Sequence, residues 1–266
     1  MEKINYNDID FNSLKKLSHQ GTQSTIYRDD DTYFKILENL CDEEKELLYR
    51  KFMEMEGIKI DNVLFPKELI FRQGKLEGYT MDFFANSMPL SYRFMVRYVD
   101  CEKLFDYVGK ASQILRDIHK NEIICQDFSF ENVFVDNDGR VVIGDIDACC
   151  YKQYDSPFIS LLMKRFWIDY RNNNIFFSQD FDRISMMLSF FNLIYDREIQ
   201  SVSKRQYNKL SRNIRTLENM KEYANILVNK NSKIETIPYL DELIDFSDNF
   251  VYDRNKLLGI SRLLKK

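Results

Sequence analysis

Three oxygen-bearing residues with a characteristic spacing constrain this chain more than any other feature. Asp127 is followed five positions later by Asn132, and Asp145 stands thirteen residues after Asn132, at the end of the apolar run 141–143. Carboxylate and amide oxygens are ligands that Mg²⁺ accepts in proteins, and a further carboxylate can orient an attacking hydroxyl. Three such groups can together hold a metal ion and orient an attacking hydroxyl.

Composition excludes several other classes of protein. The chain has 266 residues, which suits one two-lobed domain with a sizeable core. Its net charge of −4 argues against recruitment to nucleic acid or to anionic membrane, and no apolar run is long enough to span a bilayer. The five cysteines form no CxxC pair, and their odd number argues against a disulfide framework. With a polar N-terminal segment, these features predict a reduced, cytoplasmic protein without membrane or nucleic-acid partners.

The first third of the chain is expected to be rich in strands. The acidic triplet at 29–31 separates two β-prone runs, which predicts a hairpin. A charged stretch of helix formers with apolar residues at helical spacing follows, and two more strand-like runs surround a turn at Gln73–Lys75. The predicted elements are strands at 24–28 and 32–37, a helix at 43–56, and strands at 63–71 and 76–84.

Beyond residue 89 the pattern changes to helix. Apolar residues from Leu104 to Ile118 follow the spacing of a helix with one buried face. A small hairpin is predicted around Asp138-Gly139, with strands at 132–136 and 140–144. A second apolar helix is predicted near 181–191. Asp127, Asn132 and Asp145 therefore fall on loops at the edges of a mostly helical region.

The loop and strand pattern resembles the eukaryotic-like protein kinase superfamily, in particular its divergent bacterial members. Those proteins carry His-Arg-Asp-x-x-x-x-Asn and then Asp-Phe-Gly, at spacings similar to those found here. The resemblance implies an α+β, bilobal protein-kinase-like fold. A small β-rich N-lobe with one main helix would cover 1–84, and a larger, mostly helical C-lobe would cover 85–266. The hinge would lie at about 82–88, within a single kinase-like domain.

The resemblance also implies chemical roles. Asp127 would accept the proton of the substrate hydroxyl or orient it, while Asn132 and Asp145 would hold Mg²⁺. Lys35, in Tyr-Phe-Lys-Ile-Leu, matches the strand lysine that contacts the α- and β-phosphates of ATP. Lys35, Asp127 and Asn132 are the expected catalytic residues.

The nucleotide lid departs from the family pattern. Residues 19–27 align with Gly-x-Gly-x-x-Gly-x-Val, but only Gly21 is a glycine. Thr22 and Ser24 would still present backbone amides to the phosphates, and Ile26 would cover the base.

Helix and hinge positions complete the expected ATP site. Glu44, or alternatively Glu46, would pair with the strand lysine; a solvated helix face is the competing interpretation. Met81 would be the gatekeeper, and the segment from Asp82 to Phe84 would offer backbone groups to adenine.

Several positions near the motifs differ from the family or support it. Gln126 replaces the arginine before the catalytic aspartate, so activity is expected without phosphorylation of the activation loop. Ser129 replaces a lysine that touches the γ-phosphate. Asp147 replaces the glycine of Asp-Phe-Gly and is expected either to join the metal shell or to be a solvated turn residue. Asp182 resembles the structural aspartate whose carboxylate anchors the catalytic-loop backbone, and His119 is expected to pack at the edge of the core.

Three functions remain open from the sequence. The first is an ATP- and Mg²⁺-dependent kinase that phosphorylates Ser or Thr hydroxyls of a protein. The second is a kinase of the same fold acting on a small hydroxylated molecule, which the short first hairpin, Ser129 and the missing Ala-Pro-Glu element favour. The third is a pseudokinase that binds nucleotide or protein without turnover, which the degraded glycine-rich loop favours.

Overall fold

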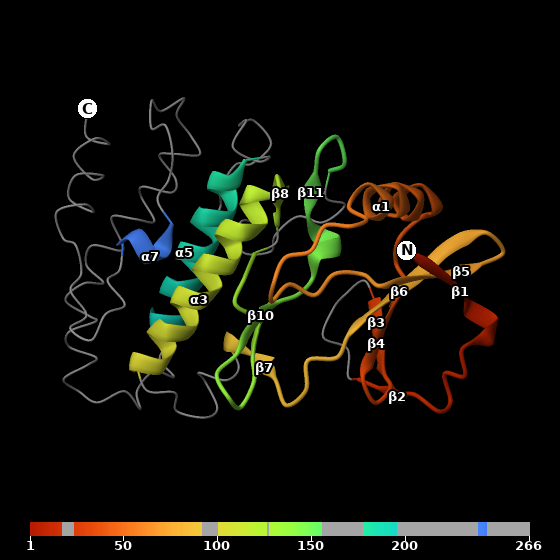
Figure 1. Cartoon of the computed structure of the whole chain (residues 1–266), viewed down its shortest axis with the longest axis horizontal. Helices are drawn as coiled ribbons and strands as arrows, with labels where there is room; N and C mark the ends of the chain where they lie inside the picture. The colour runs from red at the N-terminus through yellow and green to blue at the C-terminus, as the bar shows by residue number, and fades with distance from the viewer. Residues whose placement is uncertain (18–23, 92–100, 127, 156–177, 196–238, 244–266) are drawn as a thin grey trace.

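The computed structural model describes residues 1–17, 24–91, 101–126, 128–155, 178–195 and 239–243. Over these residues the chain is an α+β protein with a mixed sheet in its N-terminal part and helices mainly in the remainder (Figure 1). The strands are β1 (Glu2–Asn5), β2 (Lys15–Lys16), β3 (Ser24–Arg28), β4 (Thr32–Leu37), β5 (Glu68–Arg72), β6 (Lys75–Asp82), β7 (Met88–Pro89), β8 (Ile123–Ile124), β9 (Val133–Val135), β10 (Val141–Ile143) and β11 (Cys150–Tyr151). The helices are α1 (Asp42–Glu54), α3 (Cys101–Lys120), α5 (Gln179–Tyr195) and α7 (Leu240–Leu243), with 3₁₀ turns η1 (Tyr6–Asp8) and η2 (Ile146–Ala148).

Six strands form the main sheet, in the order β1-β5-β6-β4-β3-β2. β1 runs parallel to β5, and the other neighbours are antiparallel. The predicted hairpin is confirmed as β3 and β4, and it closes where Asp29 N donates a hydrogen bond to Thr32 O at 3.0 Å. β1 and β2, at the two edges of the sheet, were not predicted.

The predicted strand at 63–71 is shorter than expected. It begins only at Glu68, whereas Val63 makes a single parallel bridge to Ile143. Pro66 lies between them, and a proline has no N–H to donate to a sheet ladder. The chain before Glu68 is thereby released from the large sheet and reaches the small hairpin instead.

Helix α1 packs against the large sheet through one apolar face. Leu48 and Phe52 are buried against Leu69 and Tyr79, and the rings of Phe52 and Tyr79 meet edge-on at 5.2 Å. The other buried members of this core are Leu37, Leu76 and Met81. This packing fixes the distance between α1 and β4, the strand that carries Lys35.

The later elements are also close to their predictions. Helix α3 covers the predicted 104–118 and packs against β8, β10, α5 and α7 (Figure 1). The predicted hairpin is confirmed as β9 and β10, and Gly139 turns the chain with a φ of 80°. The Asp136 carboxylate accepts hydrogen bonds from the backbone of Asp138 and Arg140, both at 2.9 Å.

A two-stranded ladder that the sequence did not predict joins two distant segments. Cys150 pairs with Ile124, and Tyr151 with Ile123. The chain that precedes residue 125 therefore lies beside the chain that leaves η2.

None of the helices in the described ranges is both long enough and apolar enough to cross a membrane.

Candidate functional site

Lys35 stands in a row of residues that crosses the large sheet. Ile26 on β3 and Tyr79 on β6 are its direct cross-strand partners. Directly opposite residues share one face of an antiparallel sheet, and Tyr79 belongs to the core against α1. The side chain of Lys35 is therefore directed towards the side of the sheet that α1 covers.

At its end the Lys35 side chain meets two carboxylates from η2 and its N-cap. Its Nζ forms an ion pair with Asp145, and both oxygens of Asp147 lie 2.9 Å from the same Nζ. These partners are 110 and 112 residues away in the chain. Together with Lys51 of α1, which contacts the same segment, they form what we name the lysine cluster: Lys35, Lys51, Asp145 and Asp147.

Lys35 and Asp147 stabilise each other's charge, whereas burial and the charge of Asp147 raise the pKa of Asp145. Burial alone would lower the pKa of Lys35, but the charges of Asp145 and Asp147 raise it well above its ordinary value. Burial alone would raise the pKa of Asp147, but Lys35 lowers it, with smaller contributions from Lys51 and the Tyr79 hydroxyl. Lys35 and Asp147 are thus a buried, charged pair at neutral pH.

The two carboxylates differ in exposure. The side chain of Asp147 is 1% exposed, whereas that of Asp145 is 37% exposed. The expectation that Asp147 is a solvated turn residue is therefore wrong, and its carboxylate is engaged with Lys35. Asp145 has a φ of 63° and a ψ of 37°, a left-handed conformation that few non-glycine residues adopt. Such backbone strain at an accessible carboxylate is typical of functional sites.

Asn132 lies next to this segment. Its backbone oxygen accepts a hydrogen bond from Gly144 N at 2.9 Å, directly before Asp145. The hairpin of β9 and β10 creates this proximity, because Asn132 precedes the first strand and Asp145 follows the second. The structure therefore pairs Lys35 with Asp145 and places the backbone of Asn132 one residue away from Asp145.

The loop that leads to Asp127 is fixed from α5. The carboxylate of Asp182 accepts hydrogen bonds from Cys125 N at 2.6 Å and from Gln126 N at 2.8 Å. The expectation that Asp182 anchors this backbone is confirmed. Gln126 has a φ of 57°, a second strained position beside the site. Asp127 itself, like Gly21 and Thr22 of the expected lid, lies outside the described residues.

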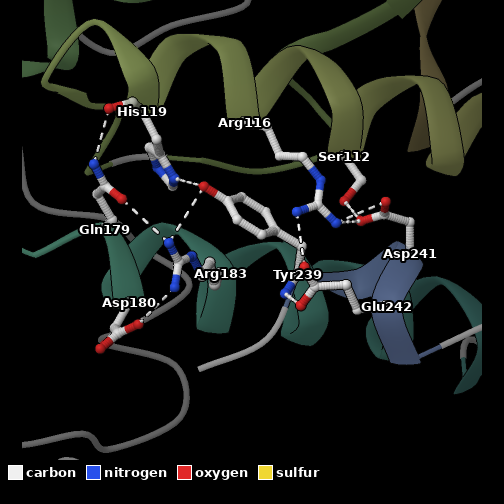
Figure 2. A network of polar contacts seen from close by, with 9 residues as sticks. All are labelled: Ser112, Arg116, His119, Gln179, Asp180, Arg183, Tyr239, Asp241 and Glu242. Carbon is white, nitrogen blue, oxygen red and sulfur yellow. Dashed lines mark hydrogen bonds and ion pairs between the residues drawn. The ribbon is translucent and has the colours of Figure 1, made fainter. Parts of the chain in front are cut away.

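His119 links Asp182 to a wider polar network, as expected of a buried residue at the edge of the core. Its Nε2 lies 3.0 Å from Asp182 Oδ2, and its Nδ1 lies 2.8 Å from the Tyr239 hydroxyl. Figure 2 shows the Tyr239 ring flanked by the guanidinium groups of Arg116 and Arg183, which lie 4.0 and 4.2 Å from its centroid. We name the residues of Figure 2 the tyrosine cluster: Ser112, Arg116, His119, Gln179, Asp180, Arg183, Tyr239, Asp241 and Glu242.

The expected glutamate partner of Lys35 needs correction. Glu44 Oε2 accepts a hydrogen bond from Cys41 N at 2.8 Å and so caps the N-terminus of α1. Glu46 pairs with Arg50 at 2.8 Å on the exposed face of the helix. Both glutamates lie in or near the first turns of α1 and bind residues close to them in sequence. The carboxylate of Asp147 lies beside Lys35, where a helix glutamate was expected.

The helix residue that does face the cluster is Lys51, which sequence reasoning missed. Its Nζ donates hydrogen bonds to the backbone oxygens of Asp147 and Cys149. A signal existed: Leu48, Lys51, Phe52 and Met55 have the i, i+3, i+4, i+7 spacing of one buried helix face. A lysine at such a position predicts a buried polar contact.

The remaining expected nucleotide contacts are placed as follows. Ser24 begins β3, opposite Leu37. Met81 is buried in the core against α1. The carboxylate of Asp82 is exposed and pairs with Lys67, while Phe84 is buried and its backbone oxygen accepts a hydrogen bond from a serine hydroxyl.

The donor set fits Mg²⁺ held jointly with phosphates. In the described part of the chain, no three or more His, Cys, Asp or Glu side chains gather as a resident metal would require. Mg²⁺ is commonly bound by one or two protein groups together with substrate phosphates and water. Asp145 is partly accessible, and the Asn132 backbone is bonded to Gly144, the residue before Asp145, so these two residues are the ones that could hold such an ion.

The cysteines near the site carry no sign of redox chemistry. Cys125, Cys149 and Cys150 are buried thiols that are not in disulfides. Burial raises the pKa of Cys149 to about 11, which keeps the thiol protonated and unreactive.

A comparison of the chain with protein-family models and with curated proteins finds no match.

Proposed function

We propose that this chain is an ATP- and Mg²⁺-dependent phosphotransferase with a bilobal protein-kinase-like fold, and that its preferred acceptor is a Ser or Thr hydroxyl of a protein. The observation that carries the proposal is the ion pair between Lys35 and Asp145, which are 110 residues apart in sequence. A phosphate-binding ammonium and a metal-binding carboxylate at one point are what phosphoryl transfer requires.

The order of elements supports the bilobal fold. The six-stranded sheet with α1 comes first in the chain, and α3 and α5 follow after the segment 83–87. In Figure 1 the small strand ladders lie between these two groups of elements. Lys35 comes from the first group, and Asn132 and Asp145 come from the loops between the two groups.

Each residue has a defined task in this proposal. Lys35 binds phosphate oxygens of ATP when Asp145 turns towards a metal ion, and Asp147 keeps Lys35 charged and in place throughout. Asp145 and Asn132 hold Mg²⁺, which would neutralise charge on the transferring phosphoryl group. Asp182 fixes the backbone at 125–126, so that the following residue, Asp127, can orient the acceptor hydroxyl.

The acceptor could instead be a small hydroxylated molecule. Ser129, which is partly exposed, supplies no cation to the γ-phosphate, and the β3–β4 hairpin is short. Under this second proposal the acceptor itself or a second metal would supply the missing charge. A pseudokinase would keep the nucleotide contacts and lack turnover.

The test is ATP turnover by the wild type and by Asp145→Asn. We expect Mg²⁺-dependent turnover that falls by roughly two orders of magnitude or more in the variant, because a metal ligand is lost while the fold remains. Asp42→Asn is the matched control: it removes an exposed carboxylate on α1 that pairs with Lys75, outside the site. Loss of turnover in the control to the same extent, or Mg²⁺-dependent turnover that Asp145→Asn leaves intact, would contradict the proposal.

Further measurements separate the acceptors. Transfer of labelled phosphate to a lysate protein or to the chain itself supports the protein kinase, and stimulation only by a metabolite pool supports the small-molecule kinase. A rise of the melting temperature with ATP and Mg²⁺, without turnover and unchanged in Asp127→Ala, would identify a pseudokinase.

A further inference from the structure

Helix α1 carries a lysine whose side chain is fully buried. Lys51 is 0% exposed, and its Nζ donates hydrogen bonds to the backbone oxygens of Asp147 at 2.8 Å and Cys149 at 2.6 Å. Both acceptors belong to the segment that directly follows Asp145. Lysine is rarely buried completely unless its charge is satisfied, so this position requires a specific explanation.

Packing alone does not explain the choice of lysine. Leu48, Phe52 and Met55 share this helix face and are buried and apolar. A methionine at position 51 would fill a similar volume without the cost of burying an ammonium group. A methionine at this position could not donate the two hydrogen bonds that Lys51 makes to the backbone oxygens of Asp147 and Cys149.

Asp147 connects this lysine to the strand lysine. Its carboxylate binds Lys35 on β4, and its backbone oxygen binds Lys51 on α1. Within the described ranges no carboxylate forms an ion pair with Lys51, whose hydrogen bonds go to the main chain. The two ammonium groups therefore hold one residue from two sides, one at its side chain and one at its backbone.

We propose that Lys51 is a positioning residue: it fixes the segment from Asp147 to Cys149 on α1 and thereby sets the positions of Lys35 and Asp145. This inference rests on the proposed function and adds the device that couples α1 to the metal-binding segment. That coupling uses a helix lysine and a loop aspartate, while the helix glutamates Glu44 and Glu46 are engaged elsewhere.

The consequence for the site follows from the geometry. Asp145 stands in a left-handed conformation directly before η2, and residues 147–149 are fixed on α1. If Lys51 is lost, this segment can relax, and the carboxylate of Asp145 would no longer be held where it could bind the metal ion. The expected defect is therefore in metal-dependent turnover more than in ATP affinity.

The experiment compares Lys51→Met, Lys51→Gln and Lys45→Met. Lys45 lies on the same helix and pairs with Glu77 at 2.7 Å, so its replacement removes an ammonium group outside the lysine cluster. Lys51→Gln retains hydrogen-bond donors without the charge and provides a second variant if Lys51→Met does not fold. Turnover is measured against ATP and against Mg²⁺, at a temperature where circular dichroism shows each variant to be folded.

We expect Lys51→Met to lower kcat about 10-fold or more, to raise the Mg²⁺ concentration for half-maximal activity several-fold, and to change the KM for ATP by less than about 3-fold. Lys51→Gln should lie between Lys51→Met and the wild type, and Lys45→Met should match the wild type. A purely structural role would lower the melting temperature and leave kcat and the Mg²⁺ requirement of the folded variants unchanged, which would overturn the inference.

Hydrogen exchange separates this inference from the proposed function. The amides of Ala148 and Cys149 donate within η2, to Asp145 O at 3.2 Å and to Ile146 O at 3.1 Å. They should exchange faster in Lys51→Met than in Lys45→Met, whether or not the protein turns over ATP. A wild type without turnover would refute the proposed function, while equal exchange in the two variants would refute the role of Lys51.

Discussion

In the lysine cluster two ammonium groups and two carboxylates meet, whereas the tyrosine cluster is built around one aromatic ring. The lysine cluster joins β4, α1 and η2, and one of its carboxylates, Asp145, remains 37% exposed. The tyrosine cluster joins α3, α5 and α7. Through His119 it reaches Asp182, a fully buried carboxylate outside the cluster that accepts three hydrogen bonds.

This difference in exposure distinguishes the candidate site from the residues that support it. Asp182 has its hydrogen-bonding capacity used by the protein and is suited to holding backbone in place. Asp145 is held by a single lysine at a strained backbone position and keeps surface for a ligand. The two buried polar networks thus differ in whether one of their carboxylates stays accessible to a ligand.

The largest effect on stability is expected from Asp182→Ala. This change leaves Cys125 N, Gln126 N and His119 without their buried acceptor, so the free energy of unfolding should fall by about 3–5 kcal/mol. Urea unfolding followed by circular dichroism measures the loss. Asp180→Ala, two residues earlier on α5 and partly exposed, should cost no more than about 1 kcal/mol. Equal losses in both variants would show that Asp182 is not the anchor described here.

Within the lysine cluster, Asp147→Asn should destabilise the fold more than Asp145→Asn. Replacement of Asp147 leaves the buried Lys35 with only the partly exposed Asp145, which should cost about 3 kcal/mol, compared with about 1 kcal/mol or less for Asp145. The same urea titration, carried out on both variants, tests this order. The reverse order would mean that Asp145 carries the structural role.

The pH dependence of the Asp147 effect has a defined sign. The fold lowers the pKa of this carboxyl, so its contribution to stability is present above the ordinary value of about 3.9 and is lost as the pH falls through the lower folded value. The stability difference between wild type and Asp147→Asn, measured by urea unfolding, should therefore be present at pH 7 and should shrink below about pH 4.

The smallest effect is expected at the outer end of the tyrosine cluster. Tyr239→Phe removes the hydroxyl that contacts His119 and Arg183 and keeps the ring between the two arginines, so we expect a loss of about 0.5–1.5 kcal/mol. The rise of the melting temperature with ATP and Mg²⁺ should match that of the wild type. A weakened response to the nucleotide would show that the tyrosine cluster acts on the site and not only on the fold.

The sequence predicted the local elements well where a strong pattern was present. The hairpin of β3 and β4 has its turn signal in three aspartates, and α3 has an uninterrupted apolar face, so both matched closely. β1, β2, β7, β8 and β11 were missed because they are only two to four residues long and are stabilised by partners far away in sequence. β1, for example, is placed by its parallel pairing with β5, some 66 residues later.

The candidate site shows a similar division. Spacing predicted roles for Asn132 and Asp145, and the family resemblance predicted a role for Lys35. The structure pairs Lys35 with Asp145 and places the backbone of Asn132 beside Gly144. The pairing of Lys35 with a helix glutamate was wrong, because a family pattern does not determine which side of a helix faces the cluster. The burial of Asp147 could not be predicted either, because its alternation with Asp145 along an extended chain is replaced by the 3₁₀ turn η2.

The sequence by itself determined which groups are available: one ammonium on a strand, an amide and two carboxylates on loops, and helices and hairpins with local signals strong enough to form them. The tertiary structure alone decided how these groups are used. It buried Asp147 with Lys35, directed Lys51 to the backbone behind Asp145 and left Asp145 accessible. The physical reason is that exposure and charge pairing depend on contacts between segments about 100 residues apart, as between Lys35 and Asp147, and no local pattern encodes such contacts.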